Sequence, residues 1–257
     1  MVYLGVKRYS YTRNARDVLG IACVVSKSQK KKLQEGVVMT TTDGKLRILE
    51  LFSGSATFSR IAKEHGHEAR TLDFNPNYKA DYCRDIITWD WKKDLGSWRP
   101  DVIWASPDCT KFSIANGGRL KEYWSPKMEP FTDDSKKAVE MVKTTLRIIE
   151  EIKPKRFFIE NPRGMLRLMP FMPKSVKCIT YCSYGAKVQK PTHIWTDSTW
   201  IWIAKPKCTA KNPTCHANRH LKDGIRAMGG AKKFERAMLP PMLCEEIIKH
   251  LETELIE

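Results

Sequence analysis

The sequence predicts an α/β fold, a mostly parallel sheet with helices on both faces. Two observations lead to this fold class. Short apolar segments typical of buried strands alternate with amphipathic segments typical of helices throughout residues 45–203. The chain's 257 residues, of which 42% are hydrophobic, are enough for one domain of this kind with small additions. Strands that alternate with helices form parallel sheets, because each helix carries the chain back across the sheet.

Each expected element follows from its own pattern. The segment 46–52 is a nearly continuous apolar run that ends before Gly54, and the helix expected at 57–65 begins just after that glycine. A second helix is expected at 134–152, where aliphatic residues recur every three or four positions, and Pro154 separates it from the next strand. The other expected strands are residues 68–73, 101–105, 156–160, 177–181 and 199–203. In the last of these, alternating Trp and Ile favour a buried core strand over a surface that stacks on bases.

The chain divides by charge into four parts. Its formal net charge is +16, and most of that excess lies in residues 1–40 and 204–236. We expect a basic N-terminal extension over 1–44, a catalytic domain over 45–203, a basic insertion with Cys and His over 204–236, and a C-terminal helix packed on the catalytic domain over 237–257. The basic parts fit a surface that follows nucleic-acid phosphates, and equally a solvated face that serves solubility.

The composition excludes several classes of protein. No apolar run reaches the roughly 18 residues of a membrane-spanning helix. The eight cysteines follow no regular spacing, which favours reduced thiols inside a cell over a disulfide scaffold. We therefore expect a cytoplasmic, monomeric protein with no membrane partner.

Polar clusters lie at the ends of four of the expected strands. Because the carboxyl ends of parallel strands meet at one edge of a sheet, where α/β proteins bind their ligands, these clusters predict a single site. The clusters are Ser53-Gly54-Ser55, Asp73, Ser106-Pro107-Asp108-Cys109 and Glu160-Asn161-Pro162.

The first two clusters are suited to a nucleoside. Gly54 allows a ligand to approach the backbone at a helix N-terminus, but a single glycine makes neither a dinucleotide fingerprint nor a phosphate-binding loop. Asp73 is placed to bind a ribose diol, and Asp85 with Ile86 to contact an adenine. Taken alone, Asp73 would be read as a helix cap or turn residue. Together these residues predict a nucleoside-containing cofactor with little phosphate.

The other two clusters pair a thiol with a carboxyl group. Cys109 can act as a nucleophile if its thiol ionises, although most cysteines are simply small buried hydrophobes. Glu160 is expected to project into the same crevice, where its carboxyl group can hold a proton. The alternative for Glu160-Asn161-Pro162 is a turn that ends the strand. A nucleophile beside such a carboxyl group is what attack on a pyrimidine ring needs.

These motifs resemble those of the cytosine-C5 DNA methyltransferases, and the resemblance covers about residues 45–203. Leu51-Phe52-Ser53-Gly54-Ser55 is similar to the family's cofactor motif. Pro107-Asp108-Cys109-Thr110-Lys111-Phe112-Ser113 resembles its Pro-Pro-Cys-x-x-Phe-Ser loop, and Glu160-Asn161-Pro162 its Glu-Asn-Val motif. The compact enzymes that phages encode are most similar, which implies action in the cytoplasm of a phage-infected host.

The resemblance implies the fold of S-adenosylmethionine-dependent methyltransferases and a mechanism. The target cytosine would be flipped out of the DNA stack. Cys109 would add to C6, Glu160 would contact N3, and C5 would be methylated. The implied cofactor-binding residues are Phe52, Ser53, Gly54, Ser55, Asp73, Asp85, Ile86 and Pro107. The implied DNA-binding residues are Arg163, Lys187, Lys190 and Thr192.

Three departures from the family pattern bear on function. Asp108 replaces the second proline, and a carboxylate beside the nucleophile would raise the thiol pKa unless it points away. The usual Gln-x-Arg-x-Arg pattern is absent after Tyr184-Gly185. Only residues 193–238 remain where a target-recognition domain would stand, so we expect a short or relaxed sequence context. Methylation of a free cytidine nucleotide or of RNA, or an inactive DNA-binding protein of the same fold, remain alternatives.

A second candidate site lies in the basic insertion. His216 and His220 have zinc-ligand spacing, whereas Cys208 and Cys215 are further apart than in usual zinc motifs, and Cys182 could replace one histidine. We expect Zn²⁺ here because a short basic insertion needs a staple. The alternative is free cysteines with histidines that face phosphates.

Overall fold

The structure of the protein is a computed structural model that describes residues 44–113, 120–209, 226–227 and 237–256. The chain forms two units, residues 1–40 and 41–257, and every described residue belongs to the second. The N-terminal extension expected over 1–44 therefore lies outside the described residues, apart from Gly44. None of the helices in the described ranges is long and apolar enough to cross a membrane.

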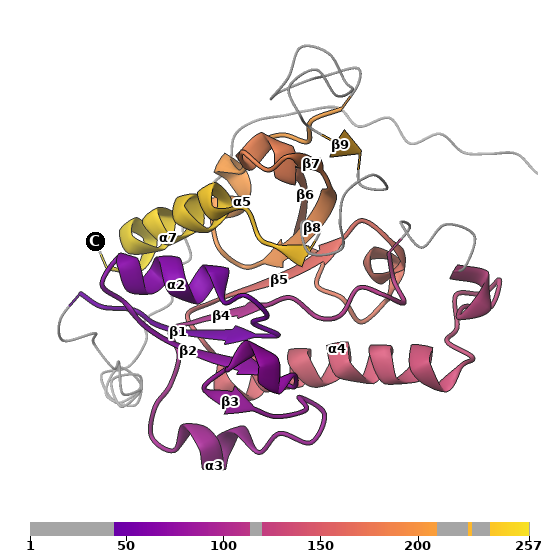
Figure 1. Ribbon diagram of the computed structural model, residues 1–257, viewed down its shortest axis with the longest axis horizontal. Helices are drawn as coiled ribbons and strands as arrows, with labels where there is room; N and C mark the ends of the chain where they lie inside the picture. Colours follow the sequence, from indigo (N-terminus) through magenta and orange to yellow (C-terminus); the bar gives the residue numbers. More distant parts are fainter. Residues whose placement is uncertain (1–43, 114–119, 210–225, 228–236, 257) are drawn as a thin grey trace, which may run out of the picture. The chain divides into compact units, whose positions relative to one another are not determined.

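A seven-stranded sheet forms the middle of the second unit (Figure 1). Its order is β3-β2-β1-β4-β5-β8-β6; the first five strands pair in parallel, whereas β8 is antiparallel to both β5 and β6. The expected mostly parallel sheet is thus confirmed. The strands are β1 Arg47–Leu51, β2 Glu68–Asp73, β3 Tyr82–Cys83, β4 Val102–Ala105, β5 Arg156–Pro162, β6 Val176–Thr180 and β8 Pro191–Thr196. A separate parallel pair joins β7 Val188–Gln189 to β9 Arg226–Ala227.

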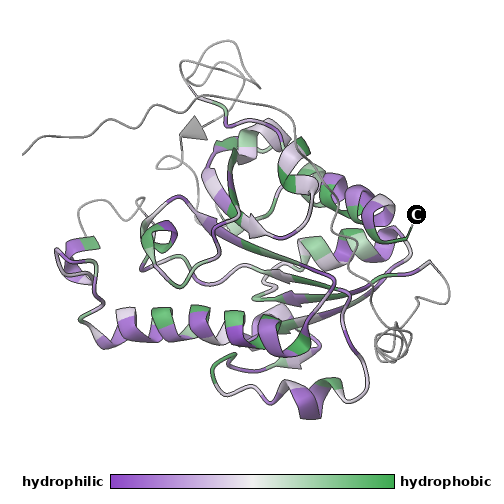
Figure 2. Cartoon of the chain, turned by 180° about the vertical axis from the view of Figure 1, so that it is seen from behind, coloured by the Kyte–Doolittle hydropathy of each residue, from purple (hydrophilic) through white to green (hydrophobic). Residues whose placement is uncertain are grey.

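Helices cover both faces of the sheet (Figure 1). On one face, Ile48 of β1 lies in a core with α2, α5 and α7; on the other, Leu49 and Leu51 lie in a core with α3 and α4. Figure 2 shows the hydrophobic side of α4 turned towards the sheet. The helices are α2 Thr57–Glu64, α3 Trp91–Leu95, α4 Asp133–Ile152, α5 Trp200–Ile203 and α7 Pro241–Leu255, with 3₁₀ turns η1 Pro76–Tyr78, η3 Met165–Leu168 and η4 Tyr181–Tyr184.

The strand expected at 199–203 is wrong, because these residues form the short helix α5. Trp200 is fully buried, whereas Trp202 is 82% exposed, so the Trp-Ile alternation does not line a core. The helix forms because side chains satisfy the N–H groups at its start. The Thr199 N–H donates to Glu254 Oε1 at 2.9 Å, and the Trp200 N–H donates to Ser198 Oγ at 3.1 Å. The N–H groups at the start of a helix have no partner within the helix, and these two acceptors supply one.

A buried carboxyl group holds the start of α2. Glu50 on β1 is 2% exposed, and its Oε2 accepts the N–H of Ser59 at 2.8 Å. The residue that precedes the helix, Ala56, offers no side-chain cap, so this contact from the sheet replaces it. Burial raises the pKa of Glu50 to about 7, because the charged form is costly without water.

The raised pKa of Glu50 makes stability depend on pH. The carboxyl group has a pKa of 4.5 when unfolded and of about 7 when folded. The neutral form therefore contributes fully to the free energy of unfolding below pH 4.5, and this contribution is lost as the pH rises towards 7. Replacing Glu50 by Gln keeps an acceptor for Ser59 and removes this loss. We expect Glu50→Gln to raise the free energy of unfolding at pH 8 by about 3 kcal/mol, with no gain at pH 4. Denaturant unfolding at both pH values measures the difference, and equal effects at the two would contradict it.

Candidate active site

The loop between β1 and α2 has an unusual backbone. Phe52, Gly54 and Ala56 have φ angles of 59°, 49° and 51°, in the left-handed region. Asp73 at the end of β2 holds this loop, because its Oδ2 accepts the N–H of Gly54 at 3.0 Å. Among the described residues, no atom lies within 4 Å of where a Cβ would stand at Gly54, so this backbone is open to a ligand. The Oγ of Ser53 is buried and has no hydrogen-bond partner in the described part of the chain.

The other predicted cofactor residues lie around the same end of the sheet. Asp85 accepts the N–H of Ile87 at 3.0 Å and forms an ion pair of 3.3 Å with Lys137. Ile86 packs into the core beside α4, which leaves only its backbone for a ligand. Ser55 is exposed and its Oγ lies 3.0 Å from the Oγ1 of Thr57.

One aromatic residue of this region was not predicted. Phe74, directly after Asp73, is 72% exposed. Its position beside a buried acidic residue at a strand end was visible in the sequence, but its exposure was not. An exposed aromatic ring next to Asp73 gives a base a surface on which to stack.

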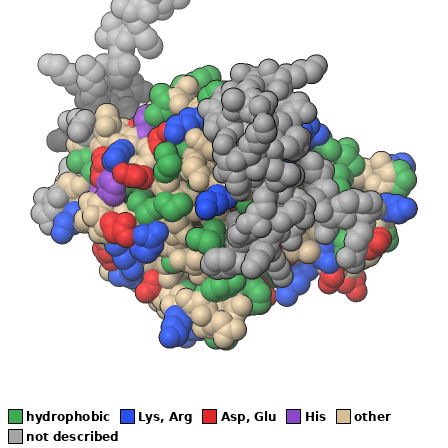
Figure 3. All heavy atoms as spheres, turned by 45° about the horizontal axis from the view of Figure 1, so that its top comes forward, with side chains coloured by type: hydrophobic (Ala, Val, Ile, Leu, Met, Phe, Trp, Pro, Cys, Tyr) green, Lys and Arg blue, Asp and Glu red, His purple; other side chains and the backbone are tan. Residues whose placement is uncertain are grey.

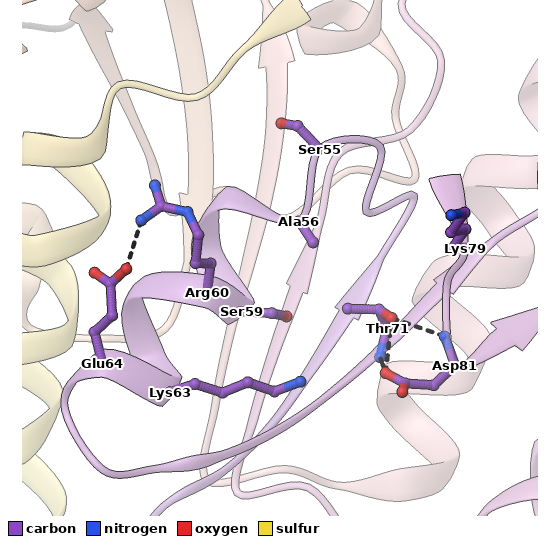
Figure 4. Close-up of a pocket in the computed structure, with 9 residues that line it drawn as sticks. All are labelled: Ser55, Ala56, Ser59, Arg60, Lys63, Glu64, Thr71, Lys79 and Asp81. Atoms are coloured by element: carbon purple, nitrogen blue, oxygen red, sulfur yellow. Dashed lines mark hydrogen bonds and ion pairs between the residues drawn. The ribbon is translucent and has the colours of Figure 1, made fainter. Parts of the chain in front are cut away.

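An open pocket of about 560 Å³ lies next to this loop, on the side of α2 (Figure 4). Its acidic groups are engaged, since Glu64 pairs with Arg60 at 2.6 Å and Asp81 accepts the N–H and Oγ1–H of Thr71. Ser55 is the only predicted cofactor residue on its wall, so this pocket is not the predicted cofactor site. It is lined by Ser55, Ala56, Ser59, Arg60, Lys63, Glu64, Thr71, Lys79 and Asp81.

Cys109 lies in a tight turn after β4. Its carbonyl oxygen accepts the N–H groups of Phe112 at 3.0 Å and Ser113 at 2.9 Å. The Oδ1 of Asp108 accepts both the N–H and the hydroxyl of Thr110, at 3.0 and 2.6 Å. The carboxylate that departs from the family pattern is therefore engaged by Thr110 rather than left free beside the thiol.

The cysteine turn is joined directly to the end of β5. The Met165 N–H donates to the carbonyl oxygen of Phe112 at 2.7 Å, and a Cβ at Gly164 would lie only 2.0 Å from that oxygen. Only glycine allows this approach. Asn161 adds a second link, since its Nδ2 donates to the carbonyl oxygen of Pro107 at 2.9 Å. The structure thus brings together the cysteine loop and the Glu-Asn segment that the sequence predicted to share a site.

Glu160 is buried beside two polar partners. Its side chain lies on β5, and the residue is 5% exposed. Its Oε1 accepts the hydroxyl of Tyr181 at 2.8 Å and the ammonium of Lys190 at 3.3 Å. The Lys190 Nζ also lies 4.3 Å from the centre of the Tyr181 ring. Tyr181 was not predicted as a site residue, and no sequence motif marks it.

The thiol of Cys109 responds to these neighbours. Burial raises its pKa to about 11; the charge of Lys190 lowers it, whereas Glu160 and Asp108 raise it. The free thiol is therefore protonated at neutral pH. A base must take its proton before it can attack a substrate.

Two of the four predicted DNA-binding residues have buried side chains. Lys190 is 4% exposed and Thr192 is fully buried, so neither side chain is free on the surface. Lys190 instead pairs with Glu160, and the Thr192 Oγ1–H donates to the Lys190 carbonyl oxygen at 3.3 Å. Arg163 and Lys187 are exposed, as a DNA contact requires.

The predicted zinc site falls largely outside the described residues, which include Cys182 and Cys208 but not Cys215, His216 or His220. Cys182 and Cys208 are both buried, and the Cys208 N–H donates to Thr180 Oγ1 at 2.8 Å. The described ranges contain no group of three His, Cys, Asp or Glu residues that could hold a metal ion. The zinc site therefore stays a prediction.

Comparison with known proteins points to the same family as the motifs of this chain. The model of the C-5 cytosine-specific DNA methylase family matches residues 46–169. Frog virus 3 (isolate Goorha) encodes a protein named "Probable DNA (cytosine-5)-methyltransferase" that is 30% identical over a 222-residue alignment, and this alignment covers 79% of this chain and 99% of the viral protein.

Two solved structures are also similar to this chain. The Dnmt2 methyltransferase of S. pombe has 18% identity and a TM-score of 0.38, and the match covers 58% of this chain and 48% of that one. A DNMT2 mutant of Spodoptera frugiperda has 15% identity and a TM-score of 0.41, and the match covers 59% of this chain and 49% of that one. The chain thus spans about half the length of these solved proteins. The family match and the viral relative, which this chain covers over nearly its full length, show that the chain belongs to the C-5 cytosine-specific DNA methylase family, the DNA (cytosine-5)-methyltransferases.

Proposed function

We propose that Cys109 and Glu160 carry out the family's reaction in this chain, the methylation of C5 of cytosine in DNA. The observation that supports this most directly is the joining of their two segments at the end of the sheet. The Asn161 side chain donates to the Pro107 carbonyl oxygen at 2.9 Å, and the charge of Glu160 acts on the Cys109 thiol. These contacts support a site in which a nucleophile and a buried carboxyl group act together at one end of the sheet.

The reaction follows from the chemistry of these two groups. The Cys109 thiolate forms a bond to C6 of the flipped cytosine, and the electron pair of the C5–C6 double bond moves into the ring. Glu160 presents a proton to N3 and stabilises that charge. When bound, S-adenosylmethionine supplies the methyl group that C5 accepts. The C5 proton then leaves to water as the S–C6 bond breaks, which restores the double bond and the free thiol.

The residues around the β1–α2 loop fit the nucleoside part of S-adenosylmethionine. The open space at Gly54 and the unpartnered Oγ of Ser53 provide a cradle with a free polar atom. Each carboxylate oxygen of Asp73 accepts one backbone N–H, and its remaining lone pairs can accept ribose hydroxyls. We assign Phe74 to stack on the adenine, beside Asp85.

Three basic side chains act on the same two residues of β6 and β8. Arg163, Arg167 and Lys207 all act on His193 of β8 and on Cys178 of β6, which are direct neighbours in the sheet. Burial and these three charges lower the pKa of His193 to about 4, so the histidine itself stays neutral. No ion pair within the described ranges neutralises the three cations. We propose that they bind phosphates of the DNA backbone.

The remaining basic residues are more dispersed. On the face shown in Figure 3, Lys and Arg side chains are interspersed with acidic and hydrophobic ones in the described part. The net charge of +16 therefore does not by itself locate the DNA. The cluster of Arg163, Arg167 and Lys207, which has no acidic partner among the described residues, is a better guide to where the DNA binds.

Trapping with a modified base tests the catalytic assignment. In duplex DNA that contains 5-fluorocytosine, the adduct cannot lose the group at C5, so the bond between Cys109 and C6 persists. With S-adenosylmethionine present, we expect a covalent complex with the wild type and none with Cys109→Ser. We expect Glu160→Gln to form it at least about 100-fold more slowly. Denaturing electrophoresis measures the complex.

Cys83→Ser is the thiol control: it removes an exposed cysteine and keeps a donor for the Phe74 carbonyl oxygen, which lies 3.6 Å from the Cys83 Sγ, so it should form the complex like the wild type. An adduct that survives Cys109→Ser would overturn the assignment. Methyl transfer to deoxycytidine monophosphate but not to DNA would overturn the proposed substrate.

The salt dependence of DNA binding tests the cation cluster. Each cation that contacts a phosphate adds roughly one unit to the slope of log K against log salt concentration. We expect Arg163→Gln, Arg167→Gln and Lys207→Gln each to weaken binding at low salt and to reduce that slope. Lys249→Gln on α7, where Lys249 pairs with Glu245, is the control. Unchanged slopes in all three variants would exclude the cluster as a phosphate site.

A further inference from the structure

Four groups that can hold or accept a proton lie at the end of the sheet where Asn161, the neighbour of Glu160, donates a hydrogen bond to Pro107 just before the cysteine turn. Glu160 and Lys190 form an ion pair of 3.3 Å with side chains that are 6% and 5% exposed. Tyr181 is 1% exposed and donates to the same Glu160 oxygen at 2.8 Å. The charges of Glu160 and Lys190 act on Cys109, and Cys109 in turn acts on Tyr181. The four side chains form one electrostatic unit.

A buried lysine is costly unless it has a partner. Lys190 has a single acidic partner within the described residues, and that partner is the proposed catalytic carboxyl group. The charges of Lys190 and Glu160 both act on the Cys109 thiol, so this ion pair affects the chemistry of the nucleophile as well as the fold.

We infer that Lys190 is the fixed counter-ion of the Cys109–Glu160 pair, and that the proton lost by Cys109 on attack passes to Glu160. Tyr181 is a positioning residue that holds the carboxyl group for this transfer. The inference rests on the proposed function and adds the origin of the proton that Glu160 presents to N3.

The transfer balances without an external base. The S–H bond of Cys109 breaks and its proton binds the Glu160 carboxylate, so one negative charge moves from oxygen to sulfur. Lys190 stays protonated and pairs with the thiolate instead of the carboxylate. The net charge of the unit is zero before and after. Glu160 then offers the same proton to N3 while sulfur bonds to C6, so nucleophile and ring are activated together.

The hydrogen bonds of Glu160 leave one oxygen for this proton. Tyr181 and Lys190 both donate to Oε1, and no hydrogen bond from the described residues reaches Oε2. Burial and the neighbouring Glu160 raise the pKa of Tyr181 well above its usual range, so its hydroxyl remains a donor. Tyr181 thereby fixes which oxygen is free.

The experiment measures the reactivity of Cys109 in the protein without cofactor or DNA. The rate of alkylation by iodoacetamide at pH 8.5, followed by mass spectrometry of the Cys109 peptide, is proportional to the thiolate fraction. Since one pKa unit changes this fraction tenfold, we expect Lys190→Met to react about 10-fold more slowly than wild type. Lys190→Arg should restore most of the rate. Glu160→Gln should react about 10-fold faster, because a negative neighbour is removed.

Methyl transfer is measured on the same variants, because it distinguishes failure of the inference from failure of the proposed function. The inference predicts that Glu160→Gln makes the thiol more reactive but nearly abolishes methylation, whereas Lys190→Met lowers both. If Glu160→Gln kept full methylation, the proposed function itself would fail. If Lys190→Met lost methylation but kept wild-type alkylation, the function would stand and the counter-ion would be excluded. Should Lys190→Met not fold, the double variant Lys190→Met/Glu160→Gln takes its place because it leaves no unpaired buried carboxylate, and it must react more slowly than Glu160→Gln alone.

Tyrosine variants test the positioning role. Tyr181→Phe removes the donor to Glu160, and we expect methylation to fall roughly 10-fold or more with a shifted pH–rate profile. Tyr184→Phe is the matched control, since this buried tyrosine of the same turn donates to Glu246 at 3.2 Å on α7. It should lower stability without moving the pH profile. Equal profiles for both variants would exclude a special role for Tyr181.

Discussion

The parallel pairing of β1, β4 and β5 is the constraint on which the site depends. Leu51 of β1 lies opposite Ala105 of β4, and Ala105 lies opposite Ile159 of β5. The next residues along the three strands are Phe52, Ser106 and Glu160. The cofactor loop, the segment that leads to the cysteine turn and the carboxyl group therefore begin side by side in the sheet. Residues distant in the sequence are therefore delivered to the same height by backbone hydrogen bonds alone. The chemistry needs only short loops after that, which explains the tight turn at Cys109.

The antiparallel part of the sheet supplies what the parallel part lacks. Because β8 runs against β5, Thr192 lies opposite Pro162, and the start of β8 lies beside the end of β5 that carries Glu160. The N–H of Tyr181 donates to the Lys190 carbonyl oxygen at 3.1 Å, so the turn after β6 and the start of β8 arrive together. A cation and a hydroxyl are thus added to a site whose parallel strands contribute a thiol and a carboxyl group.

The sequence carried the information for elements whose pattern is local. The core strands β1, β4 and β5 and the helix α4 have unambiguous apolar periodicity, and Cys109 and Glu160 lie at or just beyond the ends of expected strands. The short helix α5 was not predictable in this way, because its start is capped by Glu254, a residue on a distant helix. Lys190 was predicted to be a surface cation because its partner, too, is distant in the sequence. Whether a lysine is buried depends on its partner, and Glu160 is 30 residues away in the chain.

The site combines two requirements that oppose each other. A crevice that excludes water protects a covalent adduct, but the same burial raises the pKa of the Cys109 thiol to about 11. A single surface cation could not offset this, since solvent screens exposed charges. A buried cation can, but alone it would be costly, and the carboxyl group that balances it makes the thiol less acidic again. Moving the proton from sulfur to that carboxyl group resolves the conflict, because the base that hinders ionisation at rest becomes neutral at the moment of attack.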